Sequence, residues 1–246
     1  SGGVDSALSA AIAADALGAE RVRCVMMPSP YTSRESLEDA EACAKALGCP
    51  YESISIAPAM QAYETMLHGT SGTAAENIQA RARGMTLMAI SNSTGAMVLS
   101  TGNKSEMSVG YATLYGDMCG GFAVLKDVYK MTVYELCHWR NRQGEVIPQR
   151  ILTKAPTAEL RPGQTDQDSL PPYPVLDGIL RGLIEEERSA EDLEKSGYAH
   201  DTVLRVWKML DRAEYKRRQS APGVKITPRS FGKDRRYPIT NGFSAA

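Results

Sequence analysis

The feature that most constrains the fold is an alternation of short apolar strand patterns with helical patterns through about the first hundred residues. Apolar or alternating runs predict strands, and apolar residues at helical spacing between them predict helices. The expected strands cover 21–27, 51–56 and 96–100, and the expected helices cover 5–17, 32–47, 58–68 and 74–90. Because strands joined by crossover helices run parallel, we expect an α/β fold: a mostly parallel sheet flanked by helices.

Three loops adjoin the strand ends at which such folds bind their ligands. The loops 1–6, 28–33 and 101–106 are expected at the carboxyl ends of strands, so we expect them to converge on one site. A capping box of Thr32 and Glu35 is expected to open the helix after the second loop. The chain begins at Ser1, inside the first loop, so we expect the first strand to lie upstream of this chain.

The pattern changes beyond residue 110. Helical spacing returns at 129–142, 175–188 and 201–218. Residues 153–174 between them hold five prolines and little periodicity. A long irregular segment in a compact domain is more often functional than idle, so we expect 153–174 to be an ordered functional loop.

Composition excludes several classes of protein. The chain has 246 residues, a formal net charge of −1 and a pI near 6.3, which suits one large or two small domains and does not indicate nucleic-acid binding. It holds no run of 18 apolar residues, so we expect no membrane partner. Five cysteines without a CxxC pair match neither a zinc site nor a disulfide framework, and they favour a reducing cytoplasm.

The sharpest motif is the opening Ser-Gly-Gly-Val-Asp-Ser of residues 1–6. Glycines let the backbone turn tightly and present its N–H groups, and the helix that follows adds unpaired N–H donors and a positive dipole end. The segment therefore predicts an anion-binding loop that also offers two hydroxyls and a carboxylate. It is not a Walker A loop, because the GxxxxGK[ST] pattern is absent.

This loop resembles the PP-loop of the ATP pyrophosphatases, whose fold is also described as adenine nucleotide α-hydrolase-like. Further segments are similar to NAD⁺ synthetase, in family order along the whole chain: 28–33, 76–81, 100–106, 115–117, 154–160 and 235–241. The resemblance implies one synthetase domain over 1–246, with a basic tail over about 216–246. Residues 110–121 and the tail look most like the glutamine-dependent branch, in which an amidase domain precedes the synthetase domain; that domain is not present here.

The resemblance implies amidation of deamido-NAD⁺ in two steps. The nicotinate carboxylate attacks the α-phosphate of ATP, which gives an adenylate and pyrophosphate, and ammonia then displaces AMP. In-line phosphoryl chemistry leaves the protein mainly positioning and charge neutralisation. Asp5 and Glu106 are the expected catalytic carboxylates and the expected Mg²⁺ ligands, because Mg²⁺ bridging phosphates prefers such oxygens. Glu106 could instead be only a helix-start carboxylate.

The resemblance also assigns substrate contacts. The residues expected to bind ATP, the co-substrate, are Ser1, Gly2, Gly3, Val4, Asp5, Ser6, Thr101, Lys130 and Thr157. The residues expected to bind deamido-NAD⁺ are Tyr31, Arg81, Glu106, Tyr111, Tyr115, Asp117 and Lys216. For the tyrosines, stacking on a ring competes with loop packing. Lys130 and Arg81 could be surface residues, and the tail, with eight basic residues over 216–236, could bind a pyrophosphate or be a solvated run.

One position departs from the ammonia-dependent branch. That branch has a lysine before Tyr-Gly-Asp that contacts deamido-NAD⁺, whereas this chain has Leu114, which favours glutamine as the nitrogen source. A homodimer is expected from the family, with the long helix over 74–90 as core or interface. The alternatives are another PP-loop enzyme, similar to GMP synthetase or to tRNA-modifying enzymes, and a non-catalytic ATP-binding module.

Overall fold

The computed structural model describes residues 1–242 and confirms the α/β class. Its strands are β1 (Cys24–Met26), β2 (Tyr51–Ser53), β3 (Leu99–Ser100) and β4 (Phe122–Ala123). Its helices are α1 (Val4–Leu17), α2 (Arg34–Leu47), α3 (Ala57–Met66), α4 (Gly72–Thr94), α5 (Lys104–Val109), α6 (Lys130–Asn141), α7 (Gln149–Thr153), α8 (Tyr173–Ile184), α9 (Ala190–Lys195), α10 (His200–Arg212) and α11 (Glu214–Arg217), with 3₁₀ turns at Ala19–Arg21 and Asp166–Asp168.

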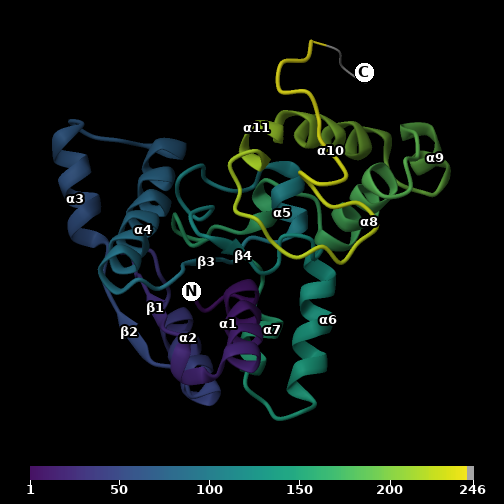
Figure 1. The fold of residues 1–246 in the computed structure, drawn as a ribbon. Coiled ribbons are helices and arrows are strands. Elements are labelled where there is room, and N and C mark those ends of the chain that lie inside the picture. The colour runs from purple at the N-terminus through teal and green to yellow at the C-terminus, as the bar shows by residue number, and fades with distance from the viewer. Residues whose placement is uncertain (243–246) are drawn as a thin grey trace.

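The strands form two separate parallel pairs within the described residues. β1 pairs with β2, with Cys24 opposite Tyr51, and β3 pairs with β4, with Leu99 opposite Phe122. In Figure 1 the amino-terminal end of the chain lies between the two pairs. The three predicted strands are confirmed as β1, β2 and β3, each shorter than expected, and β4 was not predicted.

Two local predictions were wrong. The side chain that caps α2 belongs to Ser33, which accepts a hydrogen bond from the Ser36 N–H, because Thr32 instead accepts from the Ser29 N–H one turn earlier. The helix expected over 201–218 is broken at Ala213 into α10 and α11. The segment 153–174 is largely irregular, as expected.

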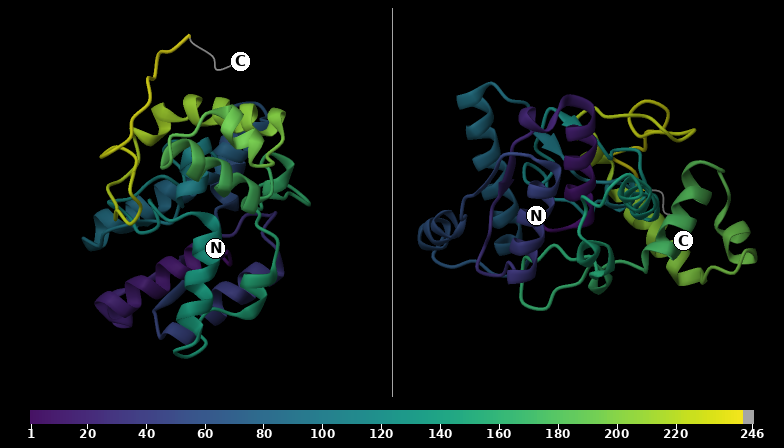
Figure 2. Two further views of the ribbon diagram at one scale, coloured as in Figure 1. Left: turned by 90° about the vertical axis from the view of Figure 1, so that its right-hand side faces the viewer. Right: turned by 90° about the horizontal axis from the view of Figure 1, so that it is seen from below.

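Two hydrophobic cores divide the molecule. The first joins α1, α2, α6 and α7, and the second joins α8, α9 and α10 with the segment around Phe231. Figures 1 and 2 show these groups at opposite ends of the molecule. Val128 belongs to the first core and Tyr129 to the second, so Lys130 begins α6 at their junction.

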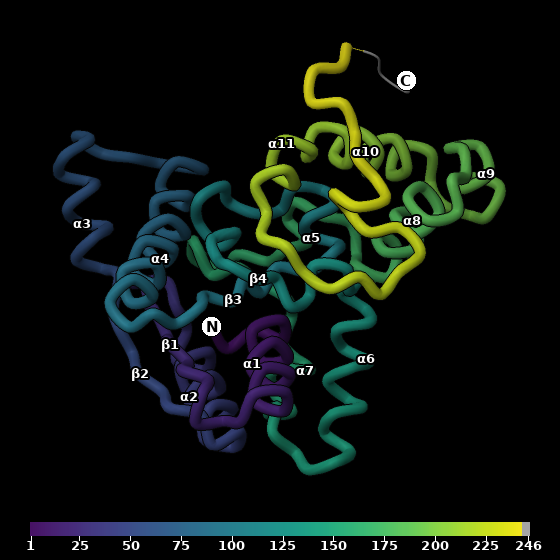
Figure 3. Tube along the Cα trace, in the orientation of Figure 1, coloured from purple at the N-terminus to yellow at the C-terminus, as the bar shows by residue number. Residues whose placement is uncertain are grey.

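The tail is not the free solvated run that was one of the two expectations, and its expected binding of a pyrophosphate stays a prediction. Figure 3 shows it running across α5 and α8 before it leaves the molecule near α10. Its cations pair with acidic side chains: Lys225 with Asp234 at 2.8 Å, and Arg229 and Arg235 with Glu187. It is therefore packed against the second core rather than solvated as a free cationic run. Residues 243–246 of the predicted tail lie outside the described residues.

All five cysteines are free thiols, as expected. No helix among residues 1–242 is long and apolar enough to cross a membrane.

Candidate active site

Two predicted carboxylates meet at one buried ammonium group. The Lys130 Nζ lies 2.5 Å from Asp5 Oδ2 and 3.2 Å from Glu106 Oε1. The Asn103 side-chain amide donates to Asp5 Oδ1 at 2.8 Å. We call Asp5, Asn103, Glu106 and Lys130 the Lys130 cluster. It joins the first turn of α1 to the start of α5 and the start of α6, so the 1–6 and 101–106 loops converge as predicted.

The position of Glu106 follows from local sequence. Asn103 is the N-cap of α5, and its side chain accepts from the Glu106 N–H at 3.0 Å while the Glu106 carboxylate accepts from the Asn103 N–H at 3.5 Å. This capping box fixes the helix start. Glu106 is thus a helix-start carboxylate and also a partner of Lys130, and its expected role as a Mg²⁺ ligand stays a prediction.

The electrostatics of the Lys130 cluster favour bound positive charge. Burial raises the pKa of Glu106 above its usual range, and the negative charges of Asp5 and Asp166 add to this, although the Lys130 ammonium works against it. Burial alone would lower the pKa of Lys130, but the carboxylates of Asp5 and Glu106 outweigh it and raise the pKa. A second cation near these carboxylates would lower the cost of keeping both ionised.

Asp166 extends the site beside the Lys130 cluster. Its carboxylate accepts from the Tyr111 hydroxyl at 3.2 Å and from the Tyr173 hydroxyl at 2.8 Å. The Tyr173 ring also lies under the Lys130 ammonium, 5.1 Å from its centre. The predicted Tyr111 therefore reaches this site through its hydroxyl, and burial raises its pKa.

The 1–6 loop has the geometry of an anion cradle. The hydroxyls of Ser1 and Ser6 lie 2.9 Å apart, and Ser6 Oγ donates to the Gly3 carbonyl. Gly2 has a φ of +72°, and a Cβ there would lie 2.4 Å from the Ser36 carbonyl oxygen, so only glycine fits. Gly3 is the N-cap of α1 without a side-chain cap, and the first N–H groups of the helix, beginning at Val4, remain for a ligand.

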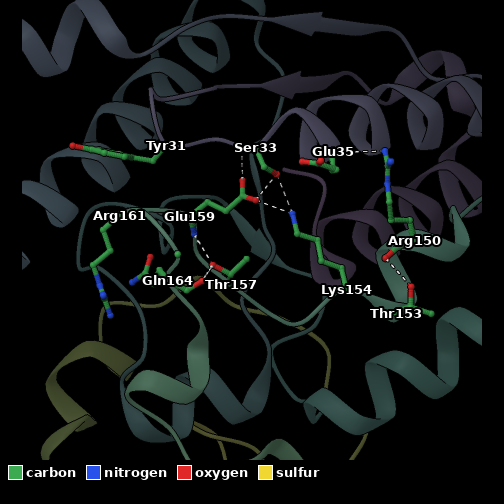
Figure 4. Close-up of a pocket in the computed structure, with 11 residues that line it drawn as sticks. Tyr31, Ser33, Glu35, Arg150, Thr153, Lys154, Thr157, Glu159, Arg161 and Gln164 are labelled. Carbon is green, nitrogen blue, oxygen red and sulfur yellow. Dashed lines mark hydrogen bonds and ion pairs between the residues drawn. The ribbon is translucent and has the colours of Figure 1, made fainter.

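An open pocket of about 450 Å³ lies beside the start of α2 (Figure 4). Tyr31 and Thr157 line it, together with Ser33, Lys154 and Glu159. The Thr157 hydroxyl donates to the Gln164 carbonyl at 2.6 Å. The contact of Gly2 with Ser36 connects this pocket to the 1–6 loop, and so the 28–33 loop joins the convergence.

Three further predicted residues surround the 110–117 loop. Lys216 Nζ donates to the carbonyls of Gly110 and Ala112, each at 2.7 Å. Asp117 accepts from the Thr113 N–H at 2.6 Å, and Arg81 donates to the Leu114 carbonyl at 3.2 Å. Arg81, Asp117 and Lys216 thus hold the loop around the position at which the sequence departs from the ammonia-dependent branch.

Two of the predicted site residues lie apart from the contacts described above. Thr101 follows β3 and makes no side-chain hydrogen bond within residues 1–242. Tyr115 is exposed, with a φ of +63°. Neither is brought into the Lys130 cluster.

Sequence reasoning missed several residues of these sites. Asn103, Lys154 and Glu159 stand inside segments that already showed the resemblance, so their position beside the predicted residues was a usable signal. Asp166 and Tyr173 lie in the 153–174 segment, which was expected to be functional, but nothing in the sequence singled them out, because only the fold brings that segment against α6.

The Lys130 cluster suits a magnesium ion. Within residues 1–242 no three acidic, histidine or cysteine side chains gather as a complete metal site. Mg²⁺ needs no such cage, since it is usually held by one or two carboxylates together with substrate phosphates. The two carboxylates that share one ammonium fit that requirement.

The chain is similar to known proteins over most of its length. The family model of NAD synthase matches residues 1–220. The glutamine-dependent NAD(+) synthetase of Thermotoga maritima is 56% identical over 99% of this chain and 43% of its own length. The solved structure of the Acinetobacter baumannii glutamine-dependent NAD+ synthetase with ADP is 49% identical, with a TM-score of 0.62 over 100% of this chain and 45% of that one.

A second solved structure is covered almost in full. The NMN synthetase of Francisella tularensis is 27% identical, with a TM-score of 0.74 over 93% of this chain and 86% of that one. By contrast, the chain spans about half the length of the curated relatives it matches.

Proposed function

Because the chain belongs to the NAD synthase family, we propose that it amidates deamido-NAD⁺ to NAD⁺ with ATP, through an adenylated intermediate, and releases AMP and pyrophosphate. The observation that carries the proposal is the Asn103–Asp5 hydrogen bond at 2.8 Å. It joins an anion-binding loop to the helix that presents Glu106. Phosphate binding and charge neutralisation therefore occur side by side.

In the first step a nicotinate carboxylate oxygen attacks the α-phosphorus of ATP, and the bond from that phosphorus to the pyrophosphate oxygen breaks. The N–H groups at the start of α1 hold the leaving pyrophosphate, and Gly2 and Gly3 let it approach the backbone. The hydroxyls of Ser1 and Ser6 add donors to the same cradle.

Asp5 and Glu106 would hold Mg²⁺, which when bound neutralises negative charge on the phosphates. Lys130 supplies a fixed positive charge beside them. Thr101 and Thr157 complete the ATP side with hydroxyls on the loops after β3 and after α7.

In the second step ammonia attacks the adenylated carbonyl carbon, and AMP leaves. Arg81, Asp117 and Lys216, with Tyr31, Tyr111 and Tyr115, form the proposed deamido-NAD⁺ side. An ammonium group has three donors, and Lys216 uses two on carbonyls, which leaves one for the substrate.

The proposal extends to the partners of the chain. An upstream amidase unit supplies ammonia from glutamine, the chain acts in the cytoplasm, and it forms a homodimer. The relatives' length and names support the amidase, and the free thiols support the compartment.

The test uses a protein that includes the natural residues preceding Ser1. With Mg-ATP, deamido-NAD⁺ and ammonium it should form equal amounts of NAD⁺, AMP and pyrophosphate. If adding deamido-NAD⁺ does not increase pyrophosphate release, the proposal is refuted.

A second candidate is amidation of the nicotinate mononucleotide, favoured by the structural likeness to the NMN synthetase. The same assay with that mononucleotide in place of deamido-NAD⁺ separates the two candidates by the ratio of their kcat/KM values.

A further inference from the structure

The Glu159 carboxylate gathers four donors at the start of α2. Its Oε1 accepts from Lys154 Nζ at 2.7 Å, from Ser33 Oγ at 2.7 Å and from Ser36 Oγ at 2.8 Å, and its Oε2 accepts from the Ser33 N–H at 3.3 Å. Figure 4 shows Ser33 and Lys154 turned toward Glu159 from two different segments. Since the amino end of a helix favours a negative charge, the carboxylate is well placed there.

This carboxylate is held as an anion. Burial would raise the pKa of Glu159, but the hydrogen bonds from Lys154, Ser33 and Ser36 outweigh burial and keep the pKa below its usual range. Its backbone has a φ of +49°, a left-handed conformation that is unfavourable for a residue other than glycine. The side-chain contacts therefore hold the backbone in a conformation that it would otherwise leave.

The same residue fixes the threonine of the loop. The Glu159 N–H donates to Thr157 Oγ1 at 3.1 Å, and the next N–H, of Leu160, donates to the Gln164 side chain at 2.8 Å. The buried Gln79 of α4 donates to the Leu160 carbonyl at 2.8 Å. The centre of the loop is therefore tied to α4 through Leu160 and to α2 through Glu159.

The contact reaches the phosphate-binding loop through Ser36. The backbone of Ser36 lies against Gly2 so closely that a Cβ on Gly2 would overlap it. Ser36 Oγ also accepts from Lys154 Nζ at 2.7 Å. The four residues Ser33, Ser36, Lys154 and Glu159 thus connect the Thr157 loop to the 1–6 loop.

We propose that Glu159 is a positioning residue, which holds the 154–165 loop and Thr157 against the start of α2 so that Thr157 faces ATP bound at the 1–6 loop. The inference rests on the proposed function for its ATP side. It goes beyond that function because it names the residue that holds Thr157 in position.

The first test compares Glu159→Ala with Glu41→Ala, a change at an exposed glutamate of α2 that makes no hydrogen bond or ion pair within residues 1–242. Hydrogen exchange of the amides over 154–165 should be faster in Glu159→Ala and unchanged in Glu41→Ala. This readout needs no substrate, so it is independent of the proposed function. Unchanged exchange in Glu159→Ala would overturn the proposal.

The second test is kinetic and uses the protein with its natural residues preceding Ser1. Glu159→Ala should raise the KM for ATP about tenfold, with a smaller change in the KM for deamido-NAD⁺ and in kcat. Glu159→Asp should restore part of the affinity, and Ser33→Ala with Ser36→Ala should lose part of it. An equal loss for both substrates would overturn the positioning role, whereas a wild-type protein without activity would refute only the proposed function.

Discussion

Two lysine-centred clusters meet at α5 and differ in what surrounds them. Lys104 is wholly buried, and its ammonium lies 2.8 Å from Asp127, 3.0 Å from Glu185 and 2.6 Å from Thr227 Oγ1. Thr227 and the Arg229 carbonyl, which also accepts from Lys104, belong to the tail. This cluster ties α5 to α8 and to the tail.

The Lys130 ammonium is almost as buried as the Lys104 ammonium, but both carboxylates that pair with Lys130 are partly exposed to solvent. Asp5 and Glu106 are each 17% exposed; in the Lys104 cluster Glu185 is 16% exposed, but Asp127 is 1% exposed. Asp5 also lies in the first turn of α1, whose N-cap Gly3 offers no side-chain cap, whereas at the start of α5 the Lys104 N–H donates to the Val128 carbonyl and the Glu106 N–H donates to the Asn103 side chain. Under the proposed function, similar ion pairs therefore serve distinct purposes: one holds α5 in place, and the other would present charge to a ligand.

The largest effect is expected at Lys104. Lys104→Met would leave the buried Asp127 carboxylate without its cation, and loss of one partner from such a pair costs about 3–5 kcal/mol. Urea unfolding should show a loss of that order. A loss below ~1 kcal/mol would remove the distinction between the two clusters.

A change in the Lys130 cluster should act on chemistry instead. Asp5→Asn keeps the shape but removes a charge that faces the phosphates, so adenylate formation should fall more than ~10-fold while the fold is retained. Circular dichroism and the urea midpoint supply the control for folding. Normal turnover with normal Mg²⁺ dependence would make Asp5 a helix-start residue only.

The pH dependence of magnesium use should be smaller but diagnostic. Since burial raises the pKa of Glu106, more of its carboxyl group is protonated near neutral pH, and only the ionised form binds Mg²⁺. The half-saturating Mg²⁺ concentration should therefore fall severalfold from about pH 7 to about pH 9. The step to measure is pyrophosphate release without ammonia, because free ammonia also varies with pH. A half-saturating Mg²⁺ concentration that does not change between these pH values would contradict the raised pKa of Glu106.

The smallest effect is expected for the exposed pairs of the tail. Arg229→Gln removes the ion pair with Glu187, and such surface pairs contribute little to stability. The melting temperature and the KM values should match those of the wild type within error. A selective rise in the KM for deamido-NAD⁺ would restore the tail as a substrate-binding run.

The convergence of the three loops was predictable because each adjoins the end of a strand or the start of a helix. Asp5 and Glu106 were singled out for the same reason, but their ion pairs with Lys130 were not predicted, because only the fold brings the start of α6 beside them. Lys104 lies within the 100–106 segment that showed the resemblance. Its partners come from three distant segments, however, and no local sequence pattern indicates that Lys104 is buried among them. The start of α2 was misplaced because Thr32 and Ser33 both suit an N-cap, and only the competing turn at Ser29 selects Ser33.

The central claim is that the Lys130 cluster neutralises the phosphates during adenylate formation. The most direct measurement is the burst of pyrophosphate from Mg-ATP with deamido-NAD⁺ and no nitrogen donor, compared between the wild type and Glu106→Gln at equal concentrations of folded protein. The account predicts a burst in the wild type and a rate more than ~10-fold slower in Glu106→Gln, with circular dichroism showing that the variant is folded. A Glu106→Gln protein with a normal burst and normal Mg²⁺ dependence would contradict it.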